Sequence, residues 1–197
     1  MSFDIHDDYL TVSELAWVRE GFSRDFPWFF HDHLNDVQLK GLKHFEDINK
    51  RIPYLEIKKH ERYLKNLLKD ISPESELTIA GSYRRGKPDS GDIDILLKGD
   101  SKIYKQFILH LEKEGYLTDK LVQGTKKYNG MCKLSNYTIH RRIDIMITKP
   151  EEYPFAILYF TGSGEFNVRM RDDALKQGYT MNEYSIKHTD TKRKVDK

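Results

Sequence analysis

The segment YTIHRRIDIMI, residues 137–147, constrains the fold most strongly because its side chains alternate in character. Successive side chains of a β-strand point to opposite faces of the sheet. A strand here places Ile139, Arg141, Ile143, Ile145 and Ile147 on one face and His140, Arg142, Asp144 and Met146 on the other. The segment therefore predicts a strand with an apolar face and a face that carries ionisable groups.

Helices and strands are grouped along the rest of the chain. Apolar residues at helical spacing predict helices over 35–50, 54–70, 101–114, 151–159 and 163–176, and a further helix that begins at Ser13. Short apolar runs predict strands over 77–81, 93–97, 131–134, 137–147 and 182–186. Helices, then a small mixed sheet, then helices again indicate an α+β fold.

Composition excludes several classes of protein. The 197 residues contain no apolar run long enough to cross a membrane, and the N-terminus lacks the apolar core of a secretory signal. One cysteine, Cys132, cannot form an internal disulfide, and its apolar surroundings predict a buried, inert thiol. We expect an intracellular protein that is not secreted, in the nucleus, the cytoplasm or a virus, without membrane association.

The formal net charge of +2 conceals an uneven distribution. Residues 1–36 carry eight acids and two bases, whereas the remaining residues carry 23 acids and 31 bases. A basic body behind an acidic N-terminal part is compatible with an anionic partner, and a solvated surface of mixed sign is the alternative. For Lys126, Lys127 and Arg141 in particular, surface charges and phosphate contacts both stay open.

The segment SGDID, residues 90–94, carries two carboxylates, Asp92 and Asp94. Because they are two residues apart on an expected strand, they project from one face. Asp144 lies on the polar face of the later strand, so the three converge if the two strands are neighbours. Clustered carboxylates repel one another, and a divalent cation with oxygen ligands removes the repulsion. The pattern predicts a two-metal site.

The segment GSYRRG, residues 81–86, precedes these carboxylates. Gly81 and Ser82 end an expected strand, where a small residue lets backbone N–H groups and a hydroxyl approach a phosphate. Arg84 and Arg85 add positive charge with forked donors that suit phosphate. The segment therefore predicts a triphosphate site beside the metal site.

Three longer segments resemble the family X DNA polymerases, the polymerase beta group of the nucleotidyltransferase superfamily. They are GSYRRGKPDSGDIDILL, HRRIDIMI and LYFTGSGEFNVRMRDDALKQGYTMNEY, and the resemblance extends from about residue 9 to 187. It implies a truncated helical duplex-binding part at 1–53, a nucleotidyltransferase palm at 54–150 and a small, truncated α/β part that selects the nucleotide at 151–197.

The resemblance also implies roles for individual residues. Asp92 and Asp94 would bind two Mg²⁺ ions, which Mn²⁺ could replace, and Asp144 would bind only the catalytic ion. The residues that would cradle the incoming dNTP are Gly81, Ser82, Arg85 and Gly91 on the phosphates, Tyr159, Phe160 and Gly162 at the sugar, and Asn167 at the base. Arg84 and Arg142 would organise the site, with Arg142 and Arg171 as the DNA-binding residues.

The chain departs from the family pattern at several points. We expect no counterpart of the family's lyase domain, no glycine-rich hairpin for DNA backbone binding in residues 1–12, and no final strand and helix. Met146 stands where the family often has an arginine, and Gly164 stands where a larger residue can pack on the incoming base. These departures fit either a natural minimal polymerase or a partial one.

The expected function is template-directed DNA synthesis on gapped or primed DNA, in short-gap filling during repair, by two-metal phosphoryl transfer. We expect a monomer, with a protein partner as one possible source of extra DNA affinity. The alternatives are a template-independent nucleotidyltransferase and a catalytically weak module that binds DNA or dNTP. Convergence of the three carboxylates in the fold tests the mechanism. Insertion on templated and single-stranded primers separates the two enzymes, and Mg²⁺-dependent dNTP binding without incorporation indicates the binding module.

Overall fold

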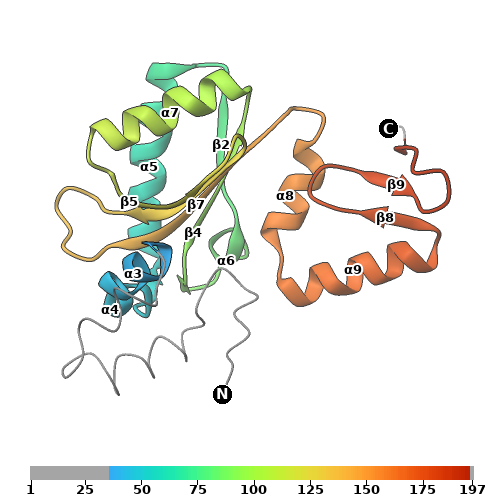
Figure 1. Ribbon diagram of the computed structural model, residues 1–197, viewed down its shortest axis with the longest axis horizontal. Coiled ribbons are helices and arrows are strands. Elements are labelled where there is room, and N and C mark those ends of the chain that lie inside the picture. Colours follow the sequence, from blue (N-terminus) through green and yellow to red (C-terminus); the bar gives the residue numbers. More distant parts are fainter. Residues whose placement is uncertain (1–35, 196–197) are drawn as a thin grey trace. The chain divides into compact units, whose positions relative to one another are not determined.

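The computed structural model describes residues 36–195 of the chain, which divides into two compact units, residues 1–50 and 51–197 (Figure 1). The helix expected over 35–50 is present as two pieces, α3 (Asp36–Lys43) and α4 (Phe45–Ile48), separated at His44. The helix expected from Ser13 lies outside the described residues.

The second unit is built on a five-stranded mixed sheet in the order β2-β4-β7-β6-β5. The strands are β2 (Glu76–Ile79), β4 (Ile93–Lys98), β5 (Leu117–Gln123), β6 (Lys127–Cys132) and β7 (Arg141–Thr148). β4 and β7 are parallel, and every other neighbouring pair is antiparallel. This confirms the expected α+β class with its small mixed sheet.

β5 was not expected from the sequence, and of the strand expected at 131–134 only the first two residues are in a strand, as the end of the longer β6. β5 is an edge strand, and its register with β6 shifts twice. Leu117 is its one buried residue. An edge strand with bulges has no continuous buried face, so its sequence lacks the alternation that reveals an inner strand.

Two long helices, α5 (Tyr54–Ile71) and α7 (Ser101–Lys113), cover one face of the sheet (Figure 1). Each has an apolar stripe at helical spacing. Asp100 caps α7, because its side chain accepts hydrogen bonds from two backbone N–H groups of the first turn. The buried residues of the stripes are Ile57, Leu64 and Leu68 in α5 and Tyr104, Phe107, Ile108 and Leu111 in α7.

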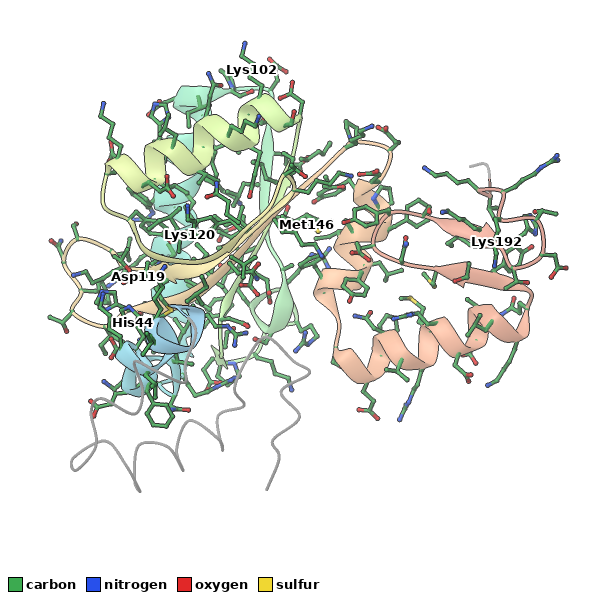
Figure 2. The ribbon with its side chains drawn as sticks, viewed as in Figure 1. His44, Lys102, Asp119, Lys120, Met146 and Lys192 are labelled. Atoms are coloured by element: carbon green, nitrogen blue, oxygen red, sulfur yellow. The ribbon has the colours of Figure 1, made fainter. Side chains whose placement is uncertain are left out.

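The two faces of β7 pack against different partners. Ile143, Ile145 and Ile147 join the core beneath α5 and α7, as the alternation predicts. Met146, on the opposite face, is 1% exposed and packs with Leu96 of β4 and Ala156. Ala156 belongs to α8 (Tyr153–Thr161), so Met146 lies where the sheet meets this helix (Figure 2). The face that carries Asp144 is therefore apolar at its other end.

The C-terminal part continues with α9 (Gly164–Lys176) and a hairpin of β8 (Tyr179–Met181) and β9 (Ile186–His188). The strand expected over 182–186 is wrong, because most of this segment is the turn of the hairpin. Asn182 Oδ1 accepts hydrogen bonds from the N–H groups of Tyr184 and Ser185. Asparagine side chains favour such turns, and this local bonding outweighs the apolar character of the segment.

Two minor strands, β1 (Ile52–Pro53) and β3 (Asp89–Ser90), pair with each other as a separate antiparallel sheet.

Cys132 is fully buried, as expected, and burial raises the pKa of its thiol to about 12. No helix within residues 36–195 has the length and apolar character that a membrane crossing requires.

Arg141 is neither a surface charge nor exposed to a phosphate, and both expectations for it are wrong. Its side chain is 4% exposed and forms two hydrogen bonds to Glu56 of α5. Arg141 Nε lies 2.7 Å from Glu56 Oε1, and the second guanidinium nitrogen lies 2.8 Å from Oε2. This buried ion pair ties the start of β7 to the first turn of α5.

Lys126 and Lys127 are half-exposed and pair with acids. Lys126 Nζ lies 3.9 Å from a Glu152 carboxylate oxygen, and Lys127 Nζ lies 3.3 Å from one of Glu183. They are surface charges in this structure.

Replacing Glu56 with glutamine should destabilise the fold at neutral pH by about 3–5 kcal/mol, because Arg141 is left buried without its counter-charge. Burial alone raises the pKa of Glu56, but His60 and Arg141 outweigh it and lower the pKa to about 2. The stabilisation from ionised Glu56 is complete above its ordinary pKa of 4.5 and is lost as the pH falls towards 2. Urea unfolding should show that the difference in unfolding free energy between the wild type and Glu56→Gln is smaller at pH 3.5 than at pH 7. An equal difference at the two pH values would contradict this.

Candidate active site

The parallel pairing of β4 and β7 brings three carboxylates together. Asp94 and Asp144 are directly paired across the two strands, and Asp92 immediately precedes β4. One carboxylate oxygen from each lies within 4.8 Å of the others, so the group could hold a metal ion. The convergence that the D-x-D motif and the later strand predict is present.

The carboxylates lie close enough to disturb one another's ionisation. Burial raises the pKa of Asp94 most, the charges of Asp92 and Asp144 raise it further, and nearby arginines offset only part, so that it reaches about 7. Burial also raises the pKa of Asp144, against the opposing effects of Arg142 and the Asn129 amide. Because the ionised forms of Asp94 and Asp144 are disfavoured, the site needs nearby positive charge, which a divalent cation supplies.

Arg142 supplies part of that charge in this structure. Its guanidinium donates a hydrogen bond to Asp92 Oδ2. Asp144, in contrast, accepts a hydrogen bond from Asn129 Nδ2 at 2.8 Å. Asn129 is not among the residues expected at this site, because the sequence pattern predicts a strand only from residue 131 onward.

The segment around Gly81 has a different local structure from the one expected. β2 ends at Ile79, and Gly81 begins the short helix α6 (Gly81–Arg84) instead of ending the strand. Gly81 has φ +55°, and a Cβ there would overlap Asp94 Oδ2. Glycine is therefore required because the Asp94 carboxylate lies directly over it. Ser82 Oγ donates to Ser90 Oγ at 2.7 Å.

A pocket of about 460 Å³ lies beside the carboxylates, within the size range of small-molecule sites. It brings together all eight residues expected to bind the nucleotide. They are Gly81, Ser82, Arg85, Gly91, Tyr159, Phe160, Gly162 and Asn167, and Arg51, Asp92, Asp94 and Gly164 complete the lining. Asp144, Arg142 and Arg171 do not line it, and Arg171 is exposed on α9.

Two arginines connect α6 to the turn after α8. Arg85 donates to the backbone oxygen of Thr161 at 2.5 Å, and Arg84 donates to the Thr161 hydroxyl at 3.2 Å. Gly162, with φ +66°, lies next to the Arg85 guanidinium. Arg85, expected on the triphosphate, therefore contacts the sugar-side turn in this structure.

Asn167 Nδ2 donates to the backbone oxygen of Tyr159 at 2.7 Å. Its Oδ1 is buried and has no hydrogen-bond partner in the part of the chain that the structure describes. The side chain is thus fixed at the pocket with one acceptor unused.

Arg51 is a second residue at the pocket that the sequence does not predict. It lines the pocket, and its Nε and one terminal nitrogen donate to Asp89 Oδ1 at 2.9 Å and 2.7 Å. The sequence marks Arg51 only as part of a helix end before Pro53. Its place at the pocket depends on the pairing of β1 with β3, which no local pattern indicates.

A mixed sheet that brings three carboxylates together, two of them lining a nucleotide-sized pocket, is the arrangement expected of the nucleotidyltransferase fold. The family model for the DNA polymerase beta palm matches residues 51–150, and that for the DNA polymerase beta thumb matches residues 156–196. The chain therefore belongs to the polymerase beta-like family X of DNA polymerases.

Its curated relatives include DNA polymerase lambda from two organisms. The chain is 34% identical to the protein of Rattus norvegicus over 89% of its own length and 33% of the relative's. The chain is 30% identical to the protein of Arabidopsis thaliana, and the match covers 79% of the chain and 32% of the relative. The chain is 26% identical to DNA nucleotidylexotransferase of Xenopus laevis, and the match covers 79% of the chain and 39% of the relative. The chain thus spans about a third of the length of the curated relatives that it matches.

Replacing Gly81 with alanine should displace the Asp94 carboxylate and weaken binding of Mn²⁺, measured by the EPR signal of the free ion, by about tenfold or more. Gly86→Ala is the matched control, because Gly86 also has positive φ, +72°, but has no atoms near the added methyl group. Equal losses in the two variants would show that backbone strain, not the overlap with Asp94, is responsible.

Replacing Asp94 with asparagine should stabilise the metal-free protein by roughly 2–4 kcal/mol above pH 7. The folded state raises the pKa of Asp94 from 3.8 to about 7, so ionisation of this group costs stability as the pH rises between these values. The gain should therefore nearly vanish at pH 4. Thermal unfolding in EDTA at both pH values measures it, and added Mg²⁺ should stabilise the wild type more than the variant.

Proposed function

We propose that this chain is a template-directed DNA polymerase that extends a primer by one deoxynucleotide at a time. The oxygen of the primer 3′-hydroxyl bonds to the α-phosphorus of a dNTP, the bond to the β-phosphate breaks, and pyrophosphate leaves with the electron pair. The proton of the hydroxyl is lost to solvent or base. The observation that carries the proposal is the carboxylate triad at the edge of the nucleotide-sized pocket.

The carboxylates fit a pair of Mg²⁺ ions, because all three offer oxygen ligands and the raised pKa values of Asp94 and Asp144 show a need for positive charge. Asp92 and Asp94 would hold both ions, and Asp144 would hold the one on the primer side. When bound, such ions lower the pKa of an attacking hydroxyl and neutralise a triphosphate. Mn²⁺ takes the same ligands and could replace Mg²⁺.

The chain's own residues would position the nucleotide. Arg85 and Arg51 offer guanidinium donors to the phosphates, together with the Ser82 hydroxyl and the backbone at Gly81 and Gly91. Because Arg85 now donates to Thr161, a bound triphosphate would compete with that contact.

The turn at the other wall of the pocket would select the sugar and the base. Tyr159, Phe160 and Gly162 would crowd a ribose 2′-hydroxyl and so favour deoxynucleotides. The unused Oδ1 of Asn167 would accept a hydrogen bond from the nucleotide. Arg142 and Arg171 would contact DNA.

We propose short-gap filling in DNA repair as the setting, on gapped or primed DNA in an intracellular compartment. The similarity to two DNA polymerase lambda proteins supports a substrate of this kind. We also propose the division into parts at 1–53, 54–150 and 151–197, which the palm and thumb matches support.

Template-independent transfer is the second candidate, because DNA nucleotidylexotransferase is among the relatives. Insertion on a templated one-nucleotide gap and on a single-stranded primer separates the two. A dependence on the template base supports the polymerase, and equal extension of both substrates supports the transferase. Binding of dNTP without insertion on either supports a catalytically weak binding module.

The full chain should insert the complementary dNTP into a one-nucleotide gap at low salt with Mg²⁺. Asp144→Ala should lower the single-turnover rate by several orders of magnitude, because a ligand of the primer-side ion is lost. Glu74→Ala, at an exposed position between α5 and β2, is the control that should keep the rate. No insertion by the folded wild type, or full activity of Asp144→Ala, would sink the proposal.

A further inference from the structure

Asn129 and Asp144 form a cross-strand pair on the functional face of the sheet. They are partners in the antiparallel register of β6 and β7. Directly opposed side chains in such a pair lie close enough to interact. The contact is a hydrogen bond from Asn129 Nδ2 to Asp144 Oδ1 at 2.8 Å, and it is partly buried.

The chemistry of the two groups determines the direction of this bond. An ionised carboxylate can only accept hydrogen bonds, so the amide must present its NH₂ group to Asp144. With Oδ1 held by the amide, rotation of the carboxylate is restricted. Oδ2 stays available to a cation.

Two of the carboxylates are held in different ways. Asp92 is paired with the charged guanidinium of Arg142, and a cation at the site competes with that charge. Asp144 is held by a neutral amide, which restricts its orientation without neutralising it. The donor on Asp144 can therefore remain in place when a cation binds.

Gly130, the residue after Asn129, is a point of close packing in β6. A Cβ on Gly130 would overlap the Asp119 backbone oxygen and the Tyr128 ring. Gly130 therefore allows the β5 backbone and the Tyr128 side chain to lie close to the β6 backbone. The irregular pairing is between β5 and β6, whereas β6 and β7 stay in register through this segment.

We propose that Asn129 is a positioning residue, which holds Asp144 by one carboxylate oxygen and so orients the other toward the cation on the primer side. The role of that cation rests on the proposed polymerase function. The hydrogen bond and its effect on cation affinity can be measured without any nucleotide transfer.

The direct test uses the metal-free full chain labelled with ¹⁵N. The side-chain NH₂ resonance of Asn129, assigned by its loss in Asn129→Leu, should shift when Asp144 is replaced with alanine. The side-chain resonance of Asn136, an exposed residue in the loop before β7, should not. An Asn129 resonance that ignores Asp144→Ala would overturn the proposal.

The functional test compares Asn129→Leu, which has similar size and no donor, with Asn129→Gln, which keeps an amide. Loss of a hydrogen-bond partner to a metal ligand typically weakens metal binding or activity by about 10–100-fold. Asn129→Leu should lose Mn²⁺ affinity and single-turnover rate in this range, while the protein remains folded and the dNTP Kd stays unchanged. Asn129→Gln should recover part of the loss, and Asn136→Leu should behave as the wild type.

A double-variant cycle separates positioning from a general structural effect. If Asn129 acts through Asp144, Asn129→Leu should not weaken Mn²⁺ binding further once Asp144 is alanine. Unchanged Mn²⁺ affinity in Asn129→Leu, or an additive loss in the double variant, contradicts the proposal. If the wild type inserts no nucleotide, the polymerase proposal fails, while the NMR and Mn²⁺ results still decide the role of Asn129.

Discussion

The parallel pairing of β4 with β7 is the constraint on which the rest of the site depends. It places Asp94 opposite Asp144 and Leu96 opposite Met146 on one face, with the isoleucines of both strands on the other. A slip of one residue would turn the carboxylates into the core and the isoleucines into the pocket. The apolar core beneath α5 and α7 thus holds the register that brings the acids together.

This arrangement concentrates negative charge, and the surrounding residues manage it in three ways. Arg142 offers a counter-charge to Asp92, and Asn129 offers a neutral hydrogen-bond donor to Asp144. Gly81, which has no side chain, leaves room for the Asp94 carboxylate. Beneath the same strand, the Glu56–Arg141 pair anchors β7 to α5. Burial and the neighbouring charges of Asp92 and Asp144 raise the pKa of Asp94 to about 7, so ionisation of this carboxylate lowers the stability of the cation-free fold.

The same face of the sheet also supports the nucleotide-side elements. Met146 and Leu96 pack against Ala156 of α8, and the turn that ends α8 is bonded by Arg84 and Arg85. An arginine at position 146 would point a charge into this apolar cluster. The methionine instead makes the contact that holds α8 beside the pocket.

Local patterns in the sequence were enough to predict several parts of the fold and of the site. Strand alternation predicted the two faces of β7, and helical spacing predicted α5 and α7. The D-x-D motif indicated the carboxylates, and the resemblance to family X DNA polymerases indicated the eight nucleotide-side residues that line the pocket. Contacts between distant residues could not be predicted from these patterns. Arg141 reached Glu56, Asn129 reached Asp144, and Arg51 reached the pocket through β1 and β3. The physical reason is that periodicity is written within one segment, whereas partners on separate segments depend on strand register and turn geometry, which only packing of the whole unit sets.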